Sequence, residues 1–360
     1  SRRGGGILAN APLTARNCRF TDNYSESGSG LAALGAAASG VLVDNCLFEA
    51  NEATAGSAGI FLRDLSAGGE VNQCIFRNNK TNRGCLYPLT SSGIVVDSCL
   101  FENNDAGANF TGGMFTWQTN FTLTNSIFRN NTATSSAAMY NDGRAGNHFF
   151  TIDNCIFENN TATGNIGAIN NWQASFLMKN CIIRGNKSKG FAQVYADGGE
   201  GNDQFTIDNC LFENNVVDDQ NPDASTFGGA FYNWQCSYVL KNSTFKNNQA
   251  DVAGAIYNDG RLYNSDFVID SCLFDGNKGN GYGGGAVYNW KSNYLLQNTT
   301  FKNNFGGSTA GAIYNGDTTT YEIQKCLFEN NGATFGGCVV NFGSGNKGTI
   351  FESRFLNNDA

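Results

Sequence analysis

Hydrophobic positions along this chain return with a nearly fixed period. A small residue, one spacer, Phe (once Ile), two spacers and Asn recur thirteen times, with successive Phe positions 25 to 33 residues apart. These positions are Phe20, Phe48, Phe76, Phe101, Phe128, Phe157, Ile183, Phe212, Phe245, Phe274, Phe301, Phe328 and Phe355. A near-constant period over the whole length predicts a solenoid, in which each repeat buries its apolar face against its neighbours.

Within one repeat, the pattern predicts short strands joined by tight bends. In residues 253–277, the segment Gly-Ala-Ile-Tyr-Asn is a short strand, and an Asp-Gly turn follows it. Two further strands carry alternating apolar residues at Phe267, Ile269, Cys272 and Phe274. Such short runs leave no room for a crossover helix, so each strand should pair in parallel with the next coil. Parallel crossovers are almost always right-handed, and we predict a right-handed parallel β-helix of about 13 coils of about 28 residues.

Composition agrees with one β-rich domain. No break in the period and no Pro-rich or charge-rich linker occurs, so we expect a single β-helix domain over residues 1–360. The 45 glycines and the low charged fraction of 15% are typical of a turn-rich chain. A net charge of −8 without a basic cluster argues against a nucleic-acid partner. Apolar runs are too short for a membrane-spanning helix.

The Gly-Ala-Ile-Tyr-Asn element recurs about once per coil. Clear copies are Gly229–Asn233, Gly254–Asn258, Gly285–Asn289, Gly311–Asn315 and Gly337–Asn341. Paired with Phe-x-x-Asn, this element resembles the repeat of the polymorphic outer membrane proteins, a bacterial surface-protein family with a β-helical passenger. The resemblance covers nearly all of the chain and implies an extracellular or cell-surface β-helix. It does not imply one activity, because the repeat occurs in adhesins and other surface proteins alike.

The residue after each Phe alternates in charge from coil to coil. The eleven positions of this charge ladder are Glu49, Arg77, Glu102, Arg129, Glu158, Arg184, Glu213, Lys246, Asp275, Lys302 and Glu329. Neighbouring coils lie about 4.8 Å apart, so stacked opposite charges attract and like charges repel. A slip by one coil would place like on like. We therefore expect the ladder to set the register and to make the true repeat a two-coil unit.

Cysteine and tryptophan form two further ladders. Nine cysteines stand two residues before the Phe, at Cys18, Cys46, Cys74, Cys99, Cys155, Cys181, Cys210, Cys272 and Cys326. We interpret them as a stack of small buried thiols, although the coil spacing would also accept disulfides. Trp172, Trp234 and Trp290 follow the Asn on alternate coils and form a candidate glycan-binding ladder. The alternative is that each ring shields a loop of its own coil.

No catalytic arrangement emerges from the sequence. A single histidine, His148, leaves no Ser-His-Asp or Cys-His pattern, and no Cys or His spacing is typical of a metal site. Asp142, Asp197 and Asp259 recur on alternate coils, about 10 Å apart, which slightly exceeds the carboxylate separation of an inverting glycosidase. We therefore expect no enzymatic activity, no cofactor and no metal ion.

Both ends of the sequence fall within the repeat. Residues 4–10 begin inside a coil, and the chain stops shortly after Phe355. At a joint between copies, strict alternation would bring two basic coils together, but Thr21 and Leu356 are neutral. We expect an extracellular structural protein whose copies stack head to tail into a filament; the alternative is a monomeric adhesin or passenger domain that binds glycans. The expected contact comprises Gly5, Gly6, Ile7, Cys18, Phe20, Thr21, Asn23, Phe351, Phe355, Leu356 and Asn358.

An apolar stripe is expected on the side of the helix. The residue between each ladder Cys and the Phe should point outward, because successive strand residues face opposite sides. The large apolar residues of this stripe are Leu47, Ile75, Leu100, Ile127, Ile156, Ile182, Leu211, Leu273 and Leu327. Thr244 and Thr300 interrupt it. Such stripes usually mark interfaces, so we expect lateral pairing of filaments. The alternative is that long side chains such as Arg129 and Lys246 cover the stripe.

Overall fold

The computed structural model describes residues 3–143, 148–199, 204–218, 225–260 and 265–360. The chain divides into two compact units, Ser1–Phe176 (unit 1) and Leu177–Ala360 (unit 2), and each is described by itself. Both are all-β parallel solenoids, and the described residues include one short 3-10 turn, η1 (Ala36–Ala38). The predicted fold class is confirmed, whereas the single domain over residues 1–360 stays a prediction.

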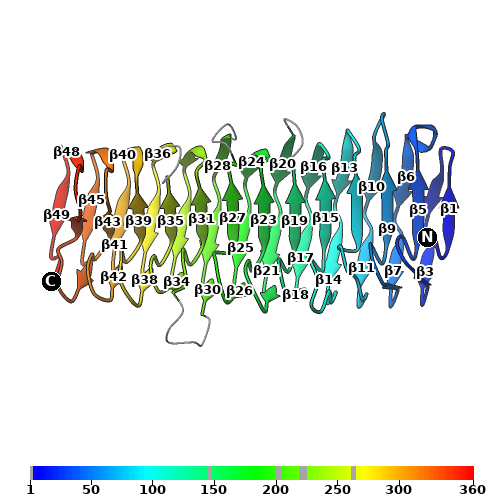
Figure 1. Ribbon diagram of the computed structural model, residues 1–360, viewed down its shortest axis with the longest axis horizontal. Helices are drawn as coiled ribbons and strands as arrows, with labels where there is room; N and C mark the ends of the chain where they lie inside the picture. Colours follow the sequence, from blue (N-terminus) through cyan, green and yellow to red (C-terminus); the bar gives the residue numbers. More distant parts are fainter. Residues whose placement is uncertain (1–2, 144–147, 200–203, 219–224, 261–264) are drawn as a thin grey trace. The chain divides into compact units, whose positions relative to one another are not determined.

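In unit 1, strands of successive coils pair in parallel and in register (Figure 1). Sheet 1 contains β1 (Ile7–Ala9), β5 (Leu31–Leu34), β9 (Ile60–Arg63), β12 (Leu86–Leu89), β15 (Met114–Trp117), β19 (Met139–Asp142) and β23 (Ile169–Trp172). Sheet 2 contains β2 (Thr14–Arg16), β6 (Val41–Asp44), β10 (Gly69–Asn72), β13 (Ile94–Asp97), β16 (Phe121–Thr124) and β20 (Phe149–Asp153). Sheet 3 contains β3 (Arg19–Thr21), β7 (Leu47–Glu49), β11 (Ile75–Arg77), β14 (Leu100–Glu102), β17 (Ile127–Arg129) and β21 (Ile156–Glu158). Shorter strands are β4 (Tyr24–Ser25), β8 (Glu52–Ala53), β18 (Thr132–Ala133) and β22 (Thr161–Ala162).

Unit 2 repeats the same strands, and β24 (Ser175–Lys179) contains the boundary between the units. Its sheet 1 contains β27 (Val194–Asp197), β31 (Phe231–Trp234), β35 (Ile256–Asp259), β39 (Val287–Trp290), β43 (Ile313–Asn315) and β47 (Val339–Asn341). Sheet 2 contains β28 (Gln204–Asp208), β32 (Ser237–Lys241), β36 (Ser265–Asp270), β40 (Ser292–Gln297), β44 (Thr320–Gln324) and β48 (Lys347–Phe351). Sheet 3 contains β25 (Ile182–Arg184), β29 (Leu211–Glu213), β33 (Thr244–Lys246), β37 (Leu273–Asp275), β41 (Thr300–Lys302), β45 (Leu327–Glu329) and β49 (Arg354–Leu356). Shorter strands are β26 (Lys187–Ser188), β30 (Val216–Val217), β34 (Gln249–Ala250), β38 (Lys278–Gly279), β42 (Phe305–Gly306) and β46 (Gly332–Ala333).

The repeated Phe of sheet 3 forms the centre of each core. In both units its ring stacks on the ring of the next coil, with centroids 4.4 to 5.0 Å apart. This spacing equals the distance between paired strands, so one inward position per coil is enough to build an aromatic column, in which Ile183 replaces Phe on one coil. The sequence period of the Phe therefore follows directly from the geometry of coil stacking.

The two asparagines after the Phe have different tasks. Asn103 is exposed and has a φ of 54°, the left-handed conformation that turns the chain out of sheet 3. Asn104 is fully buried, and its amide donates to the Phe76 carbonyl and to Asn131 Oδ1. Equivalent bonds link the buried asparagines of neighbouring coils in both units. The Asn of Phe-x-x-Asn is thus an interior hydrogen-bond ladder.

All twelve cysteines are free thiols. Those of the ladder lie at the corner between sheets 2 and 3, where the Sγ–H donates to backbone carbonyls, for example from Cys46 to Asp44 at 3.2 Å. Burial raises the pKa of Cys46 and Cys326 to about 11 and that of Cys272 to about 12. These groups therefore behave as small apolar side chains with a weak donor, in agreement with the thiol interpretation.

Candidate functional site

The outer face of sheet 1 in unit 2 carries a row of tyrosines. Tyr232, Tyr257, Tyr288 and Tyr314 each stand at the second position of their strand. The Asn that follows each Tyr points inward, so the Tyr side chain points outward. The last three rings stack with centroids 4.8 Å apart and planes 10° apart. They are buried despite facing outward, because the segment before each strand, such as 252–253, packs over them. The row therefore forms a covered aromatic layer, which we call the floor.

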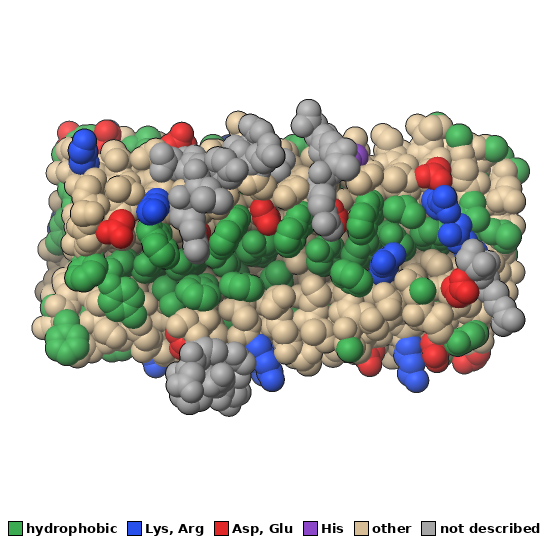
Figure 2. All heavy atoms as spheres, viewed as in Figure 1, with side chains coloured by type: hydrophobic (Ala, Val, Ile, Leu, Met, Phe, Trp, Pro, Cys, Tyr) green, Lys and Arg blue, Asp and Glu red, His purple; other side chains and the backbone are tan. Residues whose placement is uncertain are grey.

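Half-buried aromatic side chains edge this floor. Trp234 and Trp290 stand at the end of β31 and β39, and Trp234 lies 6.1 Å from Tyr232 between ring centroids. Phe191 and Phe227 pack against the floor from the preceding segments. Figure 2 shows apolar side chains gathered into a stripe over sheet 1. The described face of unit 2 therefore offers an elongated aromatic surface that follows the coils.

Unit 1 has the same arrangement with different residues. Its floor consists of Phe61, Tyr87, Phe115 and Tyr140, which are buried and follow one another at 4.9 to 5.2 Å between ring centroids. Trp117 packs against this row as a half-buried side chain. Together with the row of unit 2, we call these surfaces the aromatic grooves.

Two cations lie over the aromatic floor of unit 1: Arg3 is 5.4 Å from the Phe61 ring centroid, and Arg83 contacts three rings. The guanidinium carbon of Arg83 is 5.5 Å from the Phe110 ring centroid and 5.8 Å from those of Tyr87 and Phe115. Its Nε atom is buried and has no hydrogen-bond partner, and no described carboxylate forms an ion pair with it. A guanidinium held by ring faces keeps its charge and its remaining donors for an anion.

Trp and Asp alternate at the edge of the grooves. In unit 1 the register pairs Trp117 with Asp142 and Asp142 with Trp172, and in unit 2 it pairs Trp234 with both Asp197 and Asp259. This alternation has the two-coil period expected from the sequence. Glycine follows each of these Asp residues because a Cβ there would collide with the next coil; at Gly260 it would overlap the Lys291 carbonyl oxygen.

Asp197 places a carboxyl group at the edge of the groove in unit 2. It is largely buried, and burial raises its pKa above the ordinary value of 3.8. The backbone N–H of Gly199 opposes this effect by donating to Asp197 Oδ1 at 2.8 Å. The side chain is consequently both a turn former and a potential hydrogen-bonding group at the edge of the groove.

The structure brings all three tryptophans of the sequence-based glycan ladder to the grooves. It adds Trp117, which occupies the same position in unit 1, and the outward tyrosines, which sequence analysis missed. The available signal was the fourth letter of Gly-Ala-Ile-Tyr-Asn: an aromatic residue between inward Ile and inward Asn must face outward. Arg83 gave no signal, because its ring contacts come from three different segments.

The charge ladder forms ion pairs on the outer face of sheet 3. In unit 1, Arg77 Nε lies 2.8 Å from Glu49 Oε1, and this hydrogen bond lowers the pKa of Glu49 below 4.5. Further pairs join ladder neighbours: Arg129 to Glu102 at 2.9 Å, Lys246 to Glu213 at 3.3 Å, and Lys302 to Asp275 at 3.4 Å. All of these side chains are partly exposed, so each ion pair contributes only modestly to the stability of the fold.

The residues expected at a head-to-tail contact lie in the first coil of unit 1 and the last coil of unit 2. Phe20 and Phe355 each stack on the Phe of the adjoining coil at 4.7 Å, and Asn23 and Asn358 each join the Asn ladder. In the same two coils lie Gly5, Gly6, Ile7, Cys18, Thr21, Phe351 and Leu356. Their role in assembly stays a prediction.

Metal-type clusters and membrane-spanning helices are both absent from the described residues. No group of three or more His, Cys, Asp or Glu side chains among them is arranged to hold a metal ion. Within the same residues, no helix has the length and apolar character needed to cross a membrane.

Comparison with known proteins supports the right-handed β-helix fold. The family model described as "Right handed beta helix region" matches residues 1–99, in agreement with the predicted handedness. A search of curated proteins finds no match. The finer resemblance to polymorphic outer membrane proteins stays a prediction.

Solved structures similar to the chain are catalytic domains of GH87 alpha-1,3-glucanase. One, in complex with nigerose, is 12% identical with a TM-score of 0.38, and the alignment covers 94% of this chain and 62% of that domain. Another, a variant in complex with tetrasaccharides, is 11% identical with a TM-score of 0.30, and 98% and 65% of the two chains are covered. The chain thus spans less than two thirds of these domains, and the likeness concerns the fold alone.

These neighbours correct the expectation that the chain is not an enzyme. That prediction is contradicted, because the similar solved structures are glycosidase catalytic domains. Its reasoning relied on the lack of a histidine-containing triad and on the separation of Asp142, Asp197 and Asp259. A glycosidase needs only two suitably placed carboxyl groups, and a solenoid can carry such groups at single outward positions without any repeating motif.

Proposed function

We propose that this chain is an extracellular β-helix that binds glycans along the outer face of sheet 1. The observation that carries the proposal is the set of half-buried aromatic side chains of the groove, such as Trp117, Trp234 and Trp290, which the buried and stacked floor holds in place. Sugar rings have apolar C–H faces that pack on aromatic surfaces, while their hydroxyl groups need polar partners at the edge. The groove offers both kinds of contact.

The ligand class follows from the shape of this surface. Its half-buried tryptophans recur on every second coil, so equivalent contacts repeat along the solenoid axis within each unit. A polymer with its own repeat can use several of these contacts at once, whereas a single sugar can use one. We therefore favour an extended polysaccharide over a monosaccharide or a small metabolite.

The experiment is a binding measurement with the purified chain. Affinity electrophoresis or calorimetry against a panel of neutral and acidic polysaccharides should reveal binding that Trp234→Ala weakens roughly tenfold. Val239→Ala, which shortens an exposed apolar side chain on sheet 2 of the same unit, should leave the affinity unchanged. Equal affinity of the Trp234 variant and wild type, or no binding to any polysaccharide, would contradict the proposal.

Head-to-tail assembly into a filament is a second proposal. Each coil offers its neighbour the same Phe ring, the same Asn amide and the same strand edges, so another copy could continue these ladders. Negative-stain microscopy should then show fibres one β-helix wide, and Leu356→Lys, which places a charge in the expected joint, should yield single particles. Wild-type protein that stays monodisperse at high concentration would exclude this assembly.

A further inference from the structure

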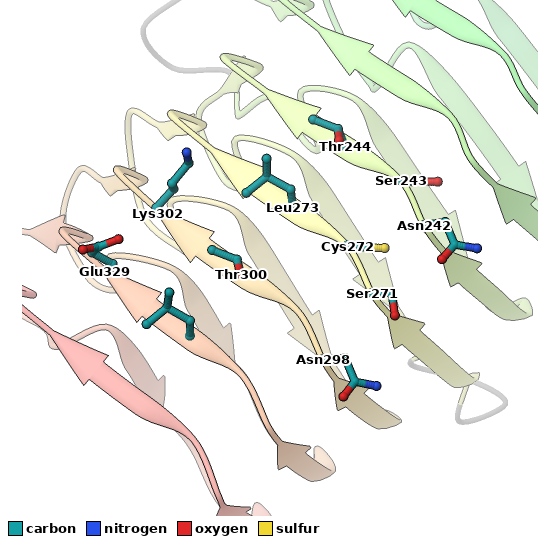
Figure 3. Close-up of a pocket in the computed structure, with 11 residues that line it drawn as sticks. Asn242, Ser243, Thr244, Ser271, Cys272, Leu273, Asn298, Thr300, Lys302 and Glu329 are labelled. Carbon is teal, nitrogen blue, oxygen red and sulfur yellow. The ribbon is translucent and has the colours of Figure 1, made fainter.

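A cavity of about 520 Å³ lies on the outer face of sheet 3 in unit 2. Figure 3 shows Thr244, Leu273 and Thr300 following one another across neighbouring coils, with Lys302 and Glu329 along one side. Leu327 closes the row. This surface is separate from the aromatic grooves, which belong to sheet 1.

The cavity exists because small and large side chains alternate at one outward position. Register pairing in unit 2 gives the order Ile182, Leu211, Thr244, Leu273, Thr300, Leu327 and Arg354, so large and small side chains alternate from Leu211 to Leu327. Each Thr leaves a gap between two half-buried leucines. In unit 1 the corresponding position is filled on every described coil from β7 to β21 by Leu47, Ile75, Leu100, Ile127 and Ile156. Unit 2 therefore presents a row of knobs and holes where unit 1 presents a ridge.

The charge two residues further along each strand follows the same alternation. It faces the same side, because strand residues alternate in direction. Coils with Leu carry the acids Glu213, Asp275 and Glu329, whereas coils with Thr carry the bases Lys246 and Lys302. Each coil with a protruding Leu is thus acidic, and each coil with a gap at Thr is basic.

We propose that sheet 3 of unit 2 binds the same surface of a second copy of this chain, with the two solenoid axes antiparallel. A two-fold axis parallel to the strands, midway between neighbouring coils, would bring each odd coil opposite an even coil. With the axis between the coils of Leu273 and Thr300, Leu273 and Leu327 each enter the gap above a Thr of the partner. In the same arrangement Asp275 faces Lys302, and Glu329 faces Lys246. One symmetry operation satisfies both shape and charge, as an isologous interface requires.

The second copy is the occupant that these features favour. A parallel arrangement would set coil against identical coil, so that Leu meets Leu and the gaps stay empty. A partner of other sequence would have to reproduce both the two-coil spacing and the alternating charge. Four coils at about 4.8 Å each give a contact only about 19 Å long, below the size of a standard interface. The pairing is therefore weak and depends on concentration.

Complementary variants test this arrangement without altering any charge. A filled variant carries Thr244→Leu and Thr300→Leu, which copies the ridge of unit 1. An emptied variant carries Leu211→Thr, Leu273→Thr and Leu327→Thr. Sedimentation equilibrium should show wild-type dimers, roughly tenfold weaker self-association of each variant, and recovery of dimers when the two variants are mixed, since every Leu then faces a Thr.

A matched control and the opposing outcomes complete the experiment. Thr206→Leu adds the same methyl groups to sheet 2 of unit 2 and should leave dimerisation unchanged, and circular dichroism confirms that each variant is folded. Wild type that remains monomeric at millimolar concentration overturns the proposal. Stronger association of the filled variant alone, or no complementation in the mixture, overturns it as well, because a merely sticky apolar stripe would give those results.

Discussion

Arg129 Nη2 lies 2.9 Å from Glu102 Oε2, and the two residues occupy paired positions on β14 and β17. On its other side Arg129 pairs in register with Glu158 on β21. The basic side chain thus stands between two acidic ones, one coil away in each direction. The alternating charges of the sequence thus place opposite charges next to one another on neighbouring coils.

Replacing Arg129 by Glu should destabilise unit 1. Arg129→Glu places three acidic side chains in consecutive coils, where they repel one another across about 4.8 Å. We expect the free energy of unfolding to fall by about 1 kcal/mol at low ionic strength, and by less in high salt, because the side chains are partly exposed. Denaturant unfolding at low and high sodium chloride measures both effects.

A matched variant separates repulsion from the loss of an arginine stem. Adding Glu102→Gln and Glu158→Gln to Arg129→Glu removes the neighbouring charges and should recover most of the stability at low salt. If this triple variant is as unstable as Arg129→Glu alone, packing of the Arg129 side chain and not charge order governs the effect.

The core of each unit could be predicted from the sequence, because it rests on positions that every coil must fill. Coil stacking requires a buried ring at the Phe position and a small group at the Cys position. The repeating sequence pattern therefore predicts both positions. The aromatic grooves were harder to predict. All four residues of β35, Ile256–Asp259, are buried, so an outward Tyr257 has the sequence character of a core residue.

Features that depend on one coil were beyond sequence analysis. The ring contacts of Arg83 involve Tyr87, Phe110 and Phe115, and Phe110 belongs to a connecting segment with no fixed length. The cavity of sheet 3 also depends on which coils carry Thr244 and Thr300. Both Thr residues interrupt the apolar stripe in the sequence. The size of the gap that each one leaves becomes clear only when the neighbouring leucines are placed in the structure.

The interior Asn ladder should be essential for stability. Asn104 donates to Phe76 O at 2.9 Å and to Asn131 Oδ1 at 3.0 Å, and it accepts from the backbone and side chain of Asn79. Asn104→Ala leaves these buried groups unpaired, so we expect a loss of about 3 kcal/mol in the free energy of unfolding. Asn103→Gly, at the exposed left-handed position next to it, should change stability little. Similar denaturation midpoints for both variants would show that the ladder bonds are replaceable.

Stability at neutral pH should increase when Asp197 is replaced by Asn. Burial raises the pKa of folded Asp197 above 3.8, so the folded state binds this proton more tightly than the unfolded state does. The contribution of Asp197 to stability therefore falls as pH rises from 3.8 through the raised value. The melting temperature of Asp197→Asn should exceed that of wild type above this window, and the difference should vanish below it. A difference that is constant from pH 3 to pH 8 would contradict the titration of Asp197.

Arg83 should give the groove of unit 1 a preference for acidic glycans. Its guanidinium has three aromatic neighbours and no described carboxylate partner, so the carboxylate or sulfate group of an acidic polysaccharide can supply the missing counter-charge. Arg83→Gln should weaken binding of acidic polysaccharides roughly tenfold and reduce its dependence on salt, while binding of neutral ones stays the same. Arg63→Gln is the control, because Arg63 already pairs with Asp64 at 3.0 Å. Calorimetry with an acidic and a neutral polysaccharide measures the preference, and an equal loss for both ligands would show that Arg83 supports the groove only through packing.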